Sequence, residues 1–330
     1  MTGVLPVSLG TLENLQVLYL DDNQFIGNVS WLSYCTKLSL ISLGSNKFSG
    51  PLPLFKSTQM LSIHLENNYF TSTIPITYSS MSSLVILSLA SNKLHGKIND
   101  IFKSMTYLRQ IHFQNNMFTS TLPDSLTNCT NLVTFDISNN SITGSLPNFS
   151  KLKRLTYFIV ARNKMTGTIP RSLLINAENS SAAKITGIDL SSNSFTGHMS
   201  DFLASDLNLA NLEWLNINSN FFSGPVSIPI VDNSTLQNLQ TLVLTQNCFT
   251  SIINTDALCS AQNISLLHMG VLYRTKGKAK ESCKKKYYFE FPYDFGNINK
   301  LTCLFESGRN LDTLILTGLG LGKIHYLLYY

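Results

Sequence analysis

Ten asparagines recur along this chain at a nearly constant interval, and each ends the same pattern of apolar residues. The pattern is L-x-x-L-x-L-x-x-N, as in the stretch from Leu15 to Asn23, and it returns every 22 to 30 residues. A repeat of this length cannot bury its apolar edge alone, so the period predicts a solenoid of stacked coils. The asparagines are Asn23, Asn46, Asn68, Asn92, Asn116, Asn140, Asn163, Asn193, Asn220 and Asn247.

Three apolar columns precede these asparagines. If each asparagine is position n, then n−8, n−5 and n−3 are apolar in all ten repeats. Positions n−5 and n−3 alternate with mostly polar neighbours, which is the period of a short strand with one buried face. The sequence therefore predicts ten strands side by side in a parallel sheet.

A second set of columns follows each asparagine. Position n+2 is apolar in every repeat and is Phe in seven, which predicts an aromatic spine inside the stack. Position n+4 is Gly in seven repeats and Ser in the others, which indicates either a positive φ or a close approach between coils. The asparagine amide carries donors and an acceptor, so we expect a ladder that pairs with backbone groups where the chain leaves the strand.

The segments NKFSGPLP (46–53), NSITGSLP (140–147) and NKMTGTIP (163–170) resemble the N-x-F/L-x-G-x-I/L-P segment of plant-type leucine-rich repeats. Such repeats form the extracellular parts of plant receptor-like kinases and receptor-like proteins, and also polygalacturonase-inhibiting proteins. The resemblance implies an α/β solenoid, a right-handed superhelix with a parallel sheet on its concave face. Its convex side would hold short 3-10 or irregular segments.

The repeat pattern covers residues 1–254 and decays over 255–330, which we interpret as degenerate repeats and an imperfect C-terminal cap. A basic island loop is expected at 271–286. Its core, 274–286, holds seven basic residues and one acid. We favour a solvated loop there over a site for acidic polysaccharide, and we expect no nucleic acid partner.

The cysteines and sequons bear on the compartment. Cys35 and Cys129 lie four coils apart, too far to bond, so we expect two buried thiols. Pairing among Cys248, Cys259, Cys283 and Cys303 is left open. Glycosylation sequons begin at Asn28, Asn128, Asn148, Asn179, Asn233 and Asn263, about as many as chance gives. We expect a protein on the extracellular face of the plasma membrane or a secreted one. We further expect that this chain is a fragment whose signal peptide and membrane span lie in sequence outside it.

Positions n−6, n−4 and n−2 of each predicted strand face solvent on the sheet side, so a partner would bind there. The candidate ligand-binding residues are Tyr19, His64, Glu66, His112, Gln114, Asp136, Tyr157 and Trp214. Each taken alone is better explained as an ordinary exposed side chain, and only together do they suggest a binding surface. His112 and Asp136 fall on adjacent coils, close enough to pair. His64 and His112 are two coils apart, too far to share a metal, and neither a metal nor a cofactor is expected.

These features favour binding over catalysis, since the sequence holds no nucleophile elbow, zinc-protease, phosphate-loop or kinase motif. The leading hypothesis is an ectodomain of a receptor-like protein that recognises a peptide or protein ligand and signals through a partner or missing domain. A co-receptor is a further candidate partner. Two alternatives remain open: a secreted or wall-associated enzyme inhibitor of polygalacturonase-inhibitor type, and an intracellular leucine-rich-repeat adaptor.

Overall fold

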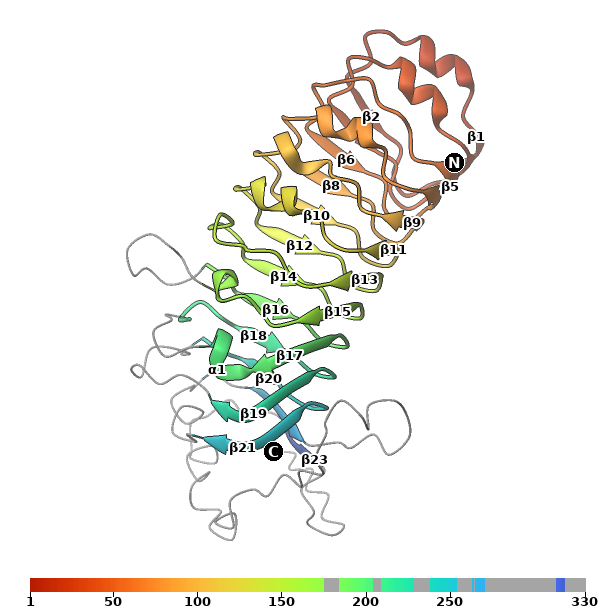
Figure 1. The fold of residues 1–330 in the computed structure, drawn as a ribbon. Helices are drawn as coiled ribbons and strands as arrows, with labels where there is room; N and C mark the ends of the chain where they lie inside the picture. The colour runs from red at the N-terminus through yellow and green to blue at the C-terminus, as the bar shows by residue number, and fades with distance from the viewer. Residues whose placement is uncertain are drawn as a thin grey trace. The chain divides into compact units, whose positions relative to one another are not determined.

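The structure, a computed structural model, describes residues 1–174, 184–203, 209–227, 238–253, 263, 265–270 and 313–317. These fall into two compact units, Met1–Lys164 and Met165–Tyr330. Each unit consists of coils that contribute one strand to a main parallel sheet and one strand to a second parallel sheet (Figure 1). The stacked coils confirm the predicted repeat fold.

In the first unit, the main sheet contains seven strands in chain order. They are β2 (Val17–Tyr19), β4 (Leu40–Ser42), β6 (Ser62–His64), β8 (Ile86–Ser88), β10 (Gln110–His112), β12 (Thr134–Asp136) and β14 (Tyr157–Ile159). Each position pairs with the equivalent position of the next repeat, so His112 is the register partner of Asp136. This register places n−6, n−4 and n−2 in straight rows on the exposed face of the sheet.

The second sheet of this unit follows each asparagine. Its strands are β1 (Thr2–Val4), β3 (Gln24–Gly27), β5 (Lys47–Pro51), β7 (Tyr69–Ser72), β9 (Lys93–Lys97), β11 (Met117–Ser120) and β13 (Ser141–Gly144). Short 3-10 helices complete the coils at η1 (Val7–Thr11), η2 (Ser30–Tyr34), η3 (Ile76–Ser80), η4 (Phe102–Ser104) and η5 (Asp124–Asn128). The sequence predicted these 3-10 turns, but it did not predict the second sheet.

The second unit repeats this plan. Its main sheet contains β16 (Gly187–Asp189), β18 (Trp214–Asn216), β20 (Thr241–Val243), β22 (Leu266–Gly270) and β23 (Thr313–Thr317). Its second sheet contains β15 (Lys164–Gly167), β17 (Ser194–His198), β19 (Phe221–Ser227) and β21 (Cys248–Ile253), with η6 (Arg171–Leu173) and α1 (Met199–Phe202). Strands β22 and β23 come from the segment interpreted as degenerate repeats. The boundary at residue 254 stays a prediction.

The asparagine ladder forms as expected. Asn116 is representative: its Nδ2 donates to the carbonyls of Phe113 and Gln114 in its own coil and of Leu89 in the preceding coil, at 2.9–3.3 Å. Its Oδ1 accepts from the backbone N–H of Leu94 at 3.0 Å. Because the amide of residue n binds the carbonyls of n−3 and n−2 in its own coil, it holds the tight turn at position n−1. That position has a positive φ in all ten repeats, from Asp22 to Gln246, a feature that the sequence analysis missed.

The apolar columns form the core. Phe48 is fully buried between Phe25 and Phe70, with ring centroids 6.1 and 6.4 Å away. From the second repeat on, the described residues at n−8, n−5 and n−3 are buried. The predicted thiols Cys35 and Cys129 are both buried and free, and burial raises the pKa of Cys129 to about 12. The spine and the inert thiols are therefore confirmed.

The small residue at n+4 meets both physical demands that the sequence suggested. Gly144 has φ +78°, and a Cβ there would lie 2.6 Å from the Cγ2 methyl of Thr121 in the preceding coil. In the repeats where Ser replaces Gly, the preceding side chain is not β-branched: Ser120, for example, follows Lys97 at a similar positive φ. A β-branched residue at n+5 of one coil is thus always followed by Gly at n+4 of the next, although Gly also occurs after other residues.

We expect Gly144→Ser to lower the free energy of unfolding by about 1–2 kcal/mol, since it combines a left-handed φ with contact against Thr121. Adding Thr121→Lys recreates the Lys97–Ser120 pair and is expected to recover about 1 kcal/mol as coupling energy. Chemical denaturation of the two single variants and the double variant measures this coupling. Strictly additive effects would show that the contact between coils does not matter.

Candidate ligand-binding surface

The main-sheet face of the first unit consists of three rows of residues, n−6 and n−4 on strands β2 to β14 and n−2 just after each strand. Six of the predicted binding residues on it lie at n−4 or n−2, namely Tyr19, His64, Glu66, His112, Gln114 and Asp136, and Tyr157 lies at n−6. The backbone register therefore brings these seven residues to one surface. Whether they bind a ligand stays a prediction.

A carboxylate pair lies at the N-terminal part of this face. Gly44 leaves a gap that two carboxylates fill: a Cβ on Gly44 would be 3.0 Å from Glu66 Oε1 and 3.2 Å from Asp21 Oδ1. Asp21 accepts hydrogen bonds from the Ser42 hydroxyl and from the Gly44 N–H. Asp21 is thus held by its own neighbours, whereas Glu66 reaches from the following coil toward Gly44.

Glu66 faces a histidine on its other side. His64 Nδ1 lies 3.8 Å from Glu66 Oε1, and both side chains are about 30% exposed. The other ring nitrogen of His64, Nε2, lies 2.7 Å from the Ser62 hydroxyl. The imidazole is therefore oriented by two neighbours, and it adds positive charge beside Glu66 only when it is protonated.

The centre of the face, called the notch below, consists of two small residues between two pairs of larger side chains. On β8 and the residues after it, Ser88 and Ala90 are small and buried. They lie between His64 and Glu66 on one coil and His112 and Gln114 on the other, as the strand pairing shows. Two acceptor atoms of the larger side chains, Glu66 Oε2 and Gln114 Oε1, are buried and have no hydrogen-bond donor among the described residues.

His112 borders the notch, and its pKa lies below its ordinary value. The largest cause is desolvation by burial, which outweighs the nearby Asp136 and Glu66 carboxylates that favour the protonated form. His64 acts in the same direction as burial. At neutral pH His112 is therefore uncharged, and it leaves the negative charge of Glu66 in place.

This pKa has a consequence for stability. The pKa of His112 is lower in the folded chain than in the unfolded chain, so the unfolded chain binds more protons at mildly acidic pH. The free energy of unfolding is therefore highest at pH values above the unfolded pKa. It decreases as the pH falls toward the folded pKa. We expect His112→Gln to have a shallower loss of unfolding free energy between pH 7.5 and 5 than the wild type. Urea denaturation at several pH values measures both slopes, and equal slopes would contradict the prediction.

The predicted pairing of His112 with Asp136 takes the form of a charge interaction across adjacent strands. The Asp136 carboxylate itself accepts a hydrogen bond from the Ser138 N–H at 2.9 Å. Among the described residues, the ion pairs within 4.0 Å are His64–Glu66 and Lys103–Asp100, so Asp136 is not held by His112 in a direct salt bridge.

Aromatic side chains flank the polar notch in the first unit. Tyr19 is 64% exposed and Tyr157 is 37% exposed, so both can contact a partner. Trp214 belongs to the second unit, where it is half-buried because its indole lies over Gly187 on the neighbouring strand. A Cβ at Gly187 would approach the indole to 2.1 Å. Trp214 is therefore partly engaged in packing, which its sequence position did not reveal.

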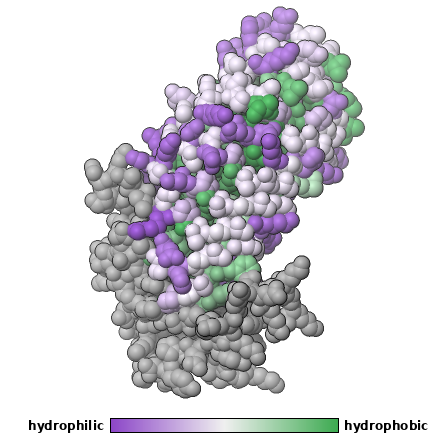
Figure 2. Space-filling view, in the orientation of Figure 1, coloured by the Kyte–Doolittle hydropathy of each residue, from purple (hydrophilic) through white to green (hydrophobic). Residues whose placement is uncertain are grey.

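The main-sheet face differs in charge from the unit that carries it. Residues Met1–Lys164 contain twelve Lys and Arg against seven Asp and Glu, a net charge of +5. The three rows of the face hold Asp21, Glu66 and Asp136 but no Lys or Arg. Figure 2 shows that hydrophilic side chains cover much of the visible surface, while apolar ones gather near the N-terminal coils.

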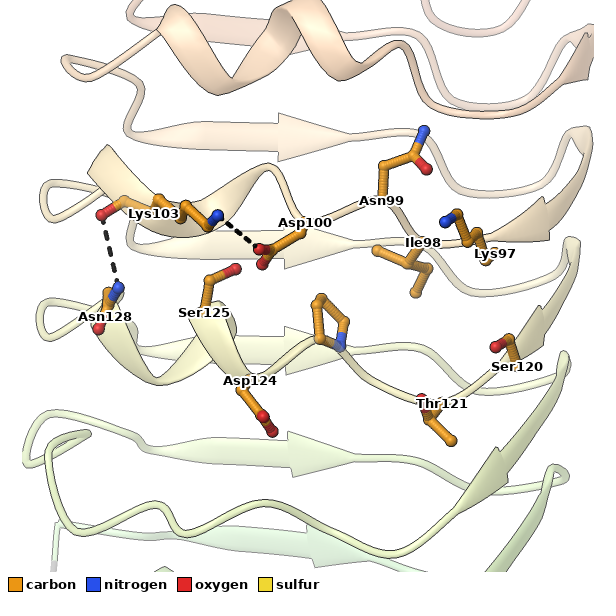
Figure 3. A pocket seen from close by; sticks show the side chains of 11 residues that line it. Lys97, Ile98, Asn99, Asp100, Lys103, Ser120, Thr121, Asp124, Ser125 and Asn128 are labelled. Atoms are coloured by element: carbon orange, nitrogen blue, oxygen red, sulfur yellow. Dashed lines mark hydrogen bonds and ion pairs between the residues drawn. The ribbon is translucent and has the colours of Figure 1, made fainter.

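A separate shallow pocket of about 750 Å³ lies beside η4 and η5 (Figure 3). Lys103 Nζ lies 3.1 Å from Asp100 Oδ2. The Ser125 hydroxyl and then Lys103 hold the pKa of Asp100 below its ordinary value. Asn128, one of the sequon residues, lines the same pocket. The opposite charges of Lys103 and Asp100 neutralise each other, so this pocket is a weaker candidate for ligand binding than the main-sheet face.

The described residues include some of the predicted glycosylation sites. Asn28, Asn148 and Asn263 are exposed and Asn128 is half-buried, while Asn179 and Asn233 lie outside the described residues.

The structure also bears on the C-terminal cysteines. Cys248 is disulfide-bonded, which answers in part the pairing left open. Cys259, Cys283, Cys303 and the basic segment 271–286 lie outside the described residues. Within the described ranges, no helix has the length and apolar run that crossing a bilayer requires, and no three-residue metal cluster is found.

The stacked parallel sheets and the internal asparagine ladder define a leucine-rich-repeat solenoid. The family described as Leucine Rich Repeat matches residues 107–129 and 131–152. Receptor-like protein EIX2 of Solanum lycopersicum is 44% identical over 158 residues, which is 47% of this chain and 15% of that protein. The receptor-like kinase TMK4 of Arabidopsis thaliana is 37% identical over 101 residues, or 30% of this chain and 11% of the kinase.

Solved structures agree with this assignment. The ectodomain of the Arabidopsis receptor kinase HAESA, solved with an IDA peptide hormone ligand, superimposes with a TM-score of 0.73 at 27% identity. The match covers 82% of this chain and 44% of that one. The plant peptide hormone receptor RGFR1 with RGF2 gives 0.69 at 23% identity, over 82% of this chain and 45% of the receptor. The chain thus has the leucine-rich-repeat fold and is similar to parts of plant receptor-like proteins, and it spans 15% or less of the curated relatives named here.

Proposed function

We propose that this chain is a ligand-recognition segment of a receptor-like protein, displayed outside the cell, and that a peptide binds on the main-sheet face. The observation that carries the proposal is the backbone register, which brings seven of the predicted binding residues to one face of the main sheet, among them Tyr19, His64 and Glu66. Exposed aromatic and polar side chains aligned on one surface are what a peptide or protein partner contacts.

The relatives support this reading. HAESA was solved with the peptide hormone IDA, and a further structure contains HAESA, IDA and the co-receptor SERK1. By analogy, we propose a peptide ligand and a co-receptor for the whole protein, which would signal through a partner or another domain. The disulfide at Cys248 favours an oxidising compartment over the intracellular adaptor alternative, because such bonds are rare in the cytosol.

A blocking experiment tests the binding face. A phage-displayed library of random twelve-residue peptides is selected on the purified chain, and enriched peptides are measured against two variants. Ala90→Trp fills the notch, whereas Thr119→Trp places the same bulk on an exposed position of the second sheet. We expect Ala90→Trp to weaken binding by tenfold or more and Thr119→Trp to leave it nearly unchanged.

Two results would overturn the proposal. If no peptide is enriched, peptide recognition by this chain is wrong. If enriched peptides bind both variants as well as the wild type, the binding surface lies elsewhere. Circular dichroism and denaturation of both variants control for misfolding, since Ala90→Trp adds a large side chain at a buried position and Thr119→Trp adds one at an exposed position.

A further inference from the structure

We propose that the second-sheet face of the first unit binds a linear polymer of uronic acids, a polysaccharide with a carboxylate on each sugar ring. This face consists of the residues at n+1, n+3 and n+5, which lie on or just after strands β3 to β13. The inference goes beyond peptide recognition and is independent of it, because it concerns the other sheet of each coil. It depends on three observations: cations without a carboxylate partner, neighbouring hydroxyl groups, and an exposed aromatic ring.

The first observation is the sign of the charge. The three rows of this face hold Lys47, Lys93 and Lys97 and no Asp or Glu. All three lysines are exposed, and among the described residues no carboxylate lies within 4.0 Å of their amino groups. The main-sheet face has the opposite composition, with carboxylates and no lysine or arginine. The two sheets therefore differ in charge, and the second-sheet face attracts a polyanion and orients it.

The arrangement of the lysines suits a polymer. Lys47 and Lys93 occupy the same position of their repeats and lie two coils apart, about 10 Å. Lys93 and Lys97 lie four residues apart on the same side of β9, about 13 Å. Carboxylates that recur along one chain can meet more than one of these lysines, and simultaneous contacts raise the affinity above that of a single ion pair.

The second observation is a set of hydroxyl groups beside the lysines. The strand pairing puts Ser49 next to Tyr69 and Thr71 next to Lys93. Each hydroxyl both donates and accepts hydrogen bonds, as the hydroxyl groups of a sugar do. The face therefore favours a polymer that carries hydroxyl groups as well as carboxylates. Its rows contain further exposed hydroxyl side chains at Thr119, Thr121, Thr143 and Ser145.

The third observation is Tyr69, whose strand β7 pairs with β5 on one side and with β9 on the other. Tyr69 is 47% exposed, and Lys93 Nζ lies 5.0 Å from its ring centroid. The lysine holds the ring through a cation–π contact, while the exposed part of the ring offers an apolar surface to the C–H groups of a sugar. Charged and apolar contacts to one sugar residue are thus available on adjacent coils.

The test measures binding to oligogalacturonate and to its methyl ester. Esterification removes the negative charge and keeps the sugar rings and their hydroxyl groups, so the ester is the matched control ligand. The intact chain is titrated with each by isothermal titration calorimetry at low ionic strength. We expect the acid form to bind at least about tenfold more tightly than the ester, and we expect added salt to weaken only the acid form.

Two double variants locate the site. Lys93→Gln/Lys97→Gln removes two charges from the second-sheet face and should weaken oligogalacturonate binding by about tenfold. Lys56→Gln/Lys151→Gln removes the same charge from exposed positions outside that sheet and should change binding by less than about twofold. Lys56 is a close control because its amino group also lies over a tyrosine ring, that of Tyr34, at 5.8 Å.

Equal binding of the acid and its methyl ester would contradict the proposal, and so would equal losses in the two double variants, which would assign the binding to net charge. If Lys284→Gln/Lys285→Gln/Lys286→Gln removes binding and Lys93→Gln/Lys97→Gln does not, the site lies outside this face. Phosphatidylserine vesicles serve as a second ligand. If they bind through Lys93 and Lys97 while oligogalacturonate does not, the face recognises an anionic membrane and the proposal is wrong.

Discussion

Replacing Asn116 with alanine is expected to lower the free energy of unfolding by about 4 kcal/mol, since four hydrogen bonds of about 1 kcal/mol each are lost. Three of these bonds come from its amide to backbone carbonyls of two coils, and the fourth is accepted from the Leu94 N–H. The side chain is 8% exposed, so water cannot easily replace the lost partners. Chemical denaturation measures the change.

The matched control is Asn131→Ala. Asn131 also donates its amide across coils, to the Thr106 carbonyl at 2.8 Å, but it does so at the exposed side of the coil and through this one hydrogen bond. We expect a loss of less than about 1 kcal/mol there, because water can take the place of the amide. Similar losses of unfolding free energy in both variants would show that the buried ladder hydrogen bonds stabilise the fold no more than an exposed one does.

Replacing Phe48 with alanine is expected to cost about 3–5 kcal/mol, the range for deleting a buried aromatic ring and leaving a cavity. Phe48 is fully buried and stacks on Phe25 and Phe70 in the coils on either side. The cavity would therefore open between three coils at once. Denaturation of the variant, with the unfolding transition followed by circular dichroism, gives the loss of stability.

Phe48→Leu is the appropriate comparison because the same column already contains a leucine, Leu94, which is fully buried. We expect this variant to lose less than about 1.5 kcal/mol, since most of the volume is retained. If leucine and alanine destabilise equally, aromatic stacking rather than filled volume determines the stability of the spine.

Much of this fold could be predicted from the sequence because the repeat fixes which residues stack. Columns such as n−5 and n−3 must be apolar in every coil, and the ladder residue must be able to donate and accept, so both appear as regular patterns. The second sheet was harder to predict. Its strands, such as Lys47–Pro51, alternate exposed and buried residues over only a few positions, and the Phe and Gly columns suggested a turn instead.

The candidate site could be predicted only as a surface. The register showed that Glu66, His112 and Gln114 share one face, but their mutual arrangement depends on side-chain direction and on the small residues between them. No sequence pattern marked Ala90 or Gly44 as part of a site. Yet Ala90 is one of the two small residues of the notch, and Gly44 leaves the gap that two carboxylates fill. Trp214 shows the opposite case, since its position predicted exposure and the glycine beside it allows packing.

The coupling between Thr121 and Gly144 limits how such a protein can grow by copying its own parts. A coil with Gly96 and Lys97 could follow a duplicate of itself, since the lysine of one copy would meet the glycine of the next. A coil with Ser120 and Thr121 could not, because the threonine methyl would meet the serine Cβ. Gene duplications in this region should therefore persist only where no coil with a β-branched residue at n+5 comes before a coil with Ser at n+4. The residues at n+4 and n+5 would then indicate where duplicated segments begin and end.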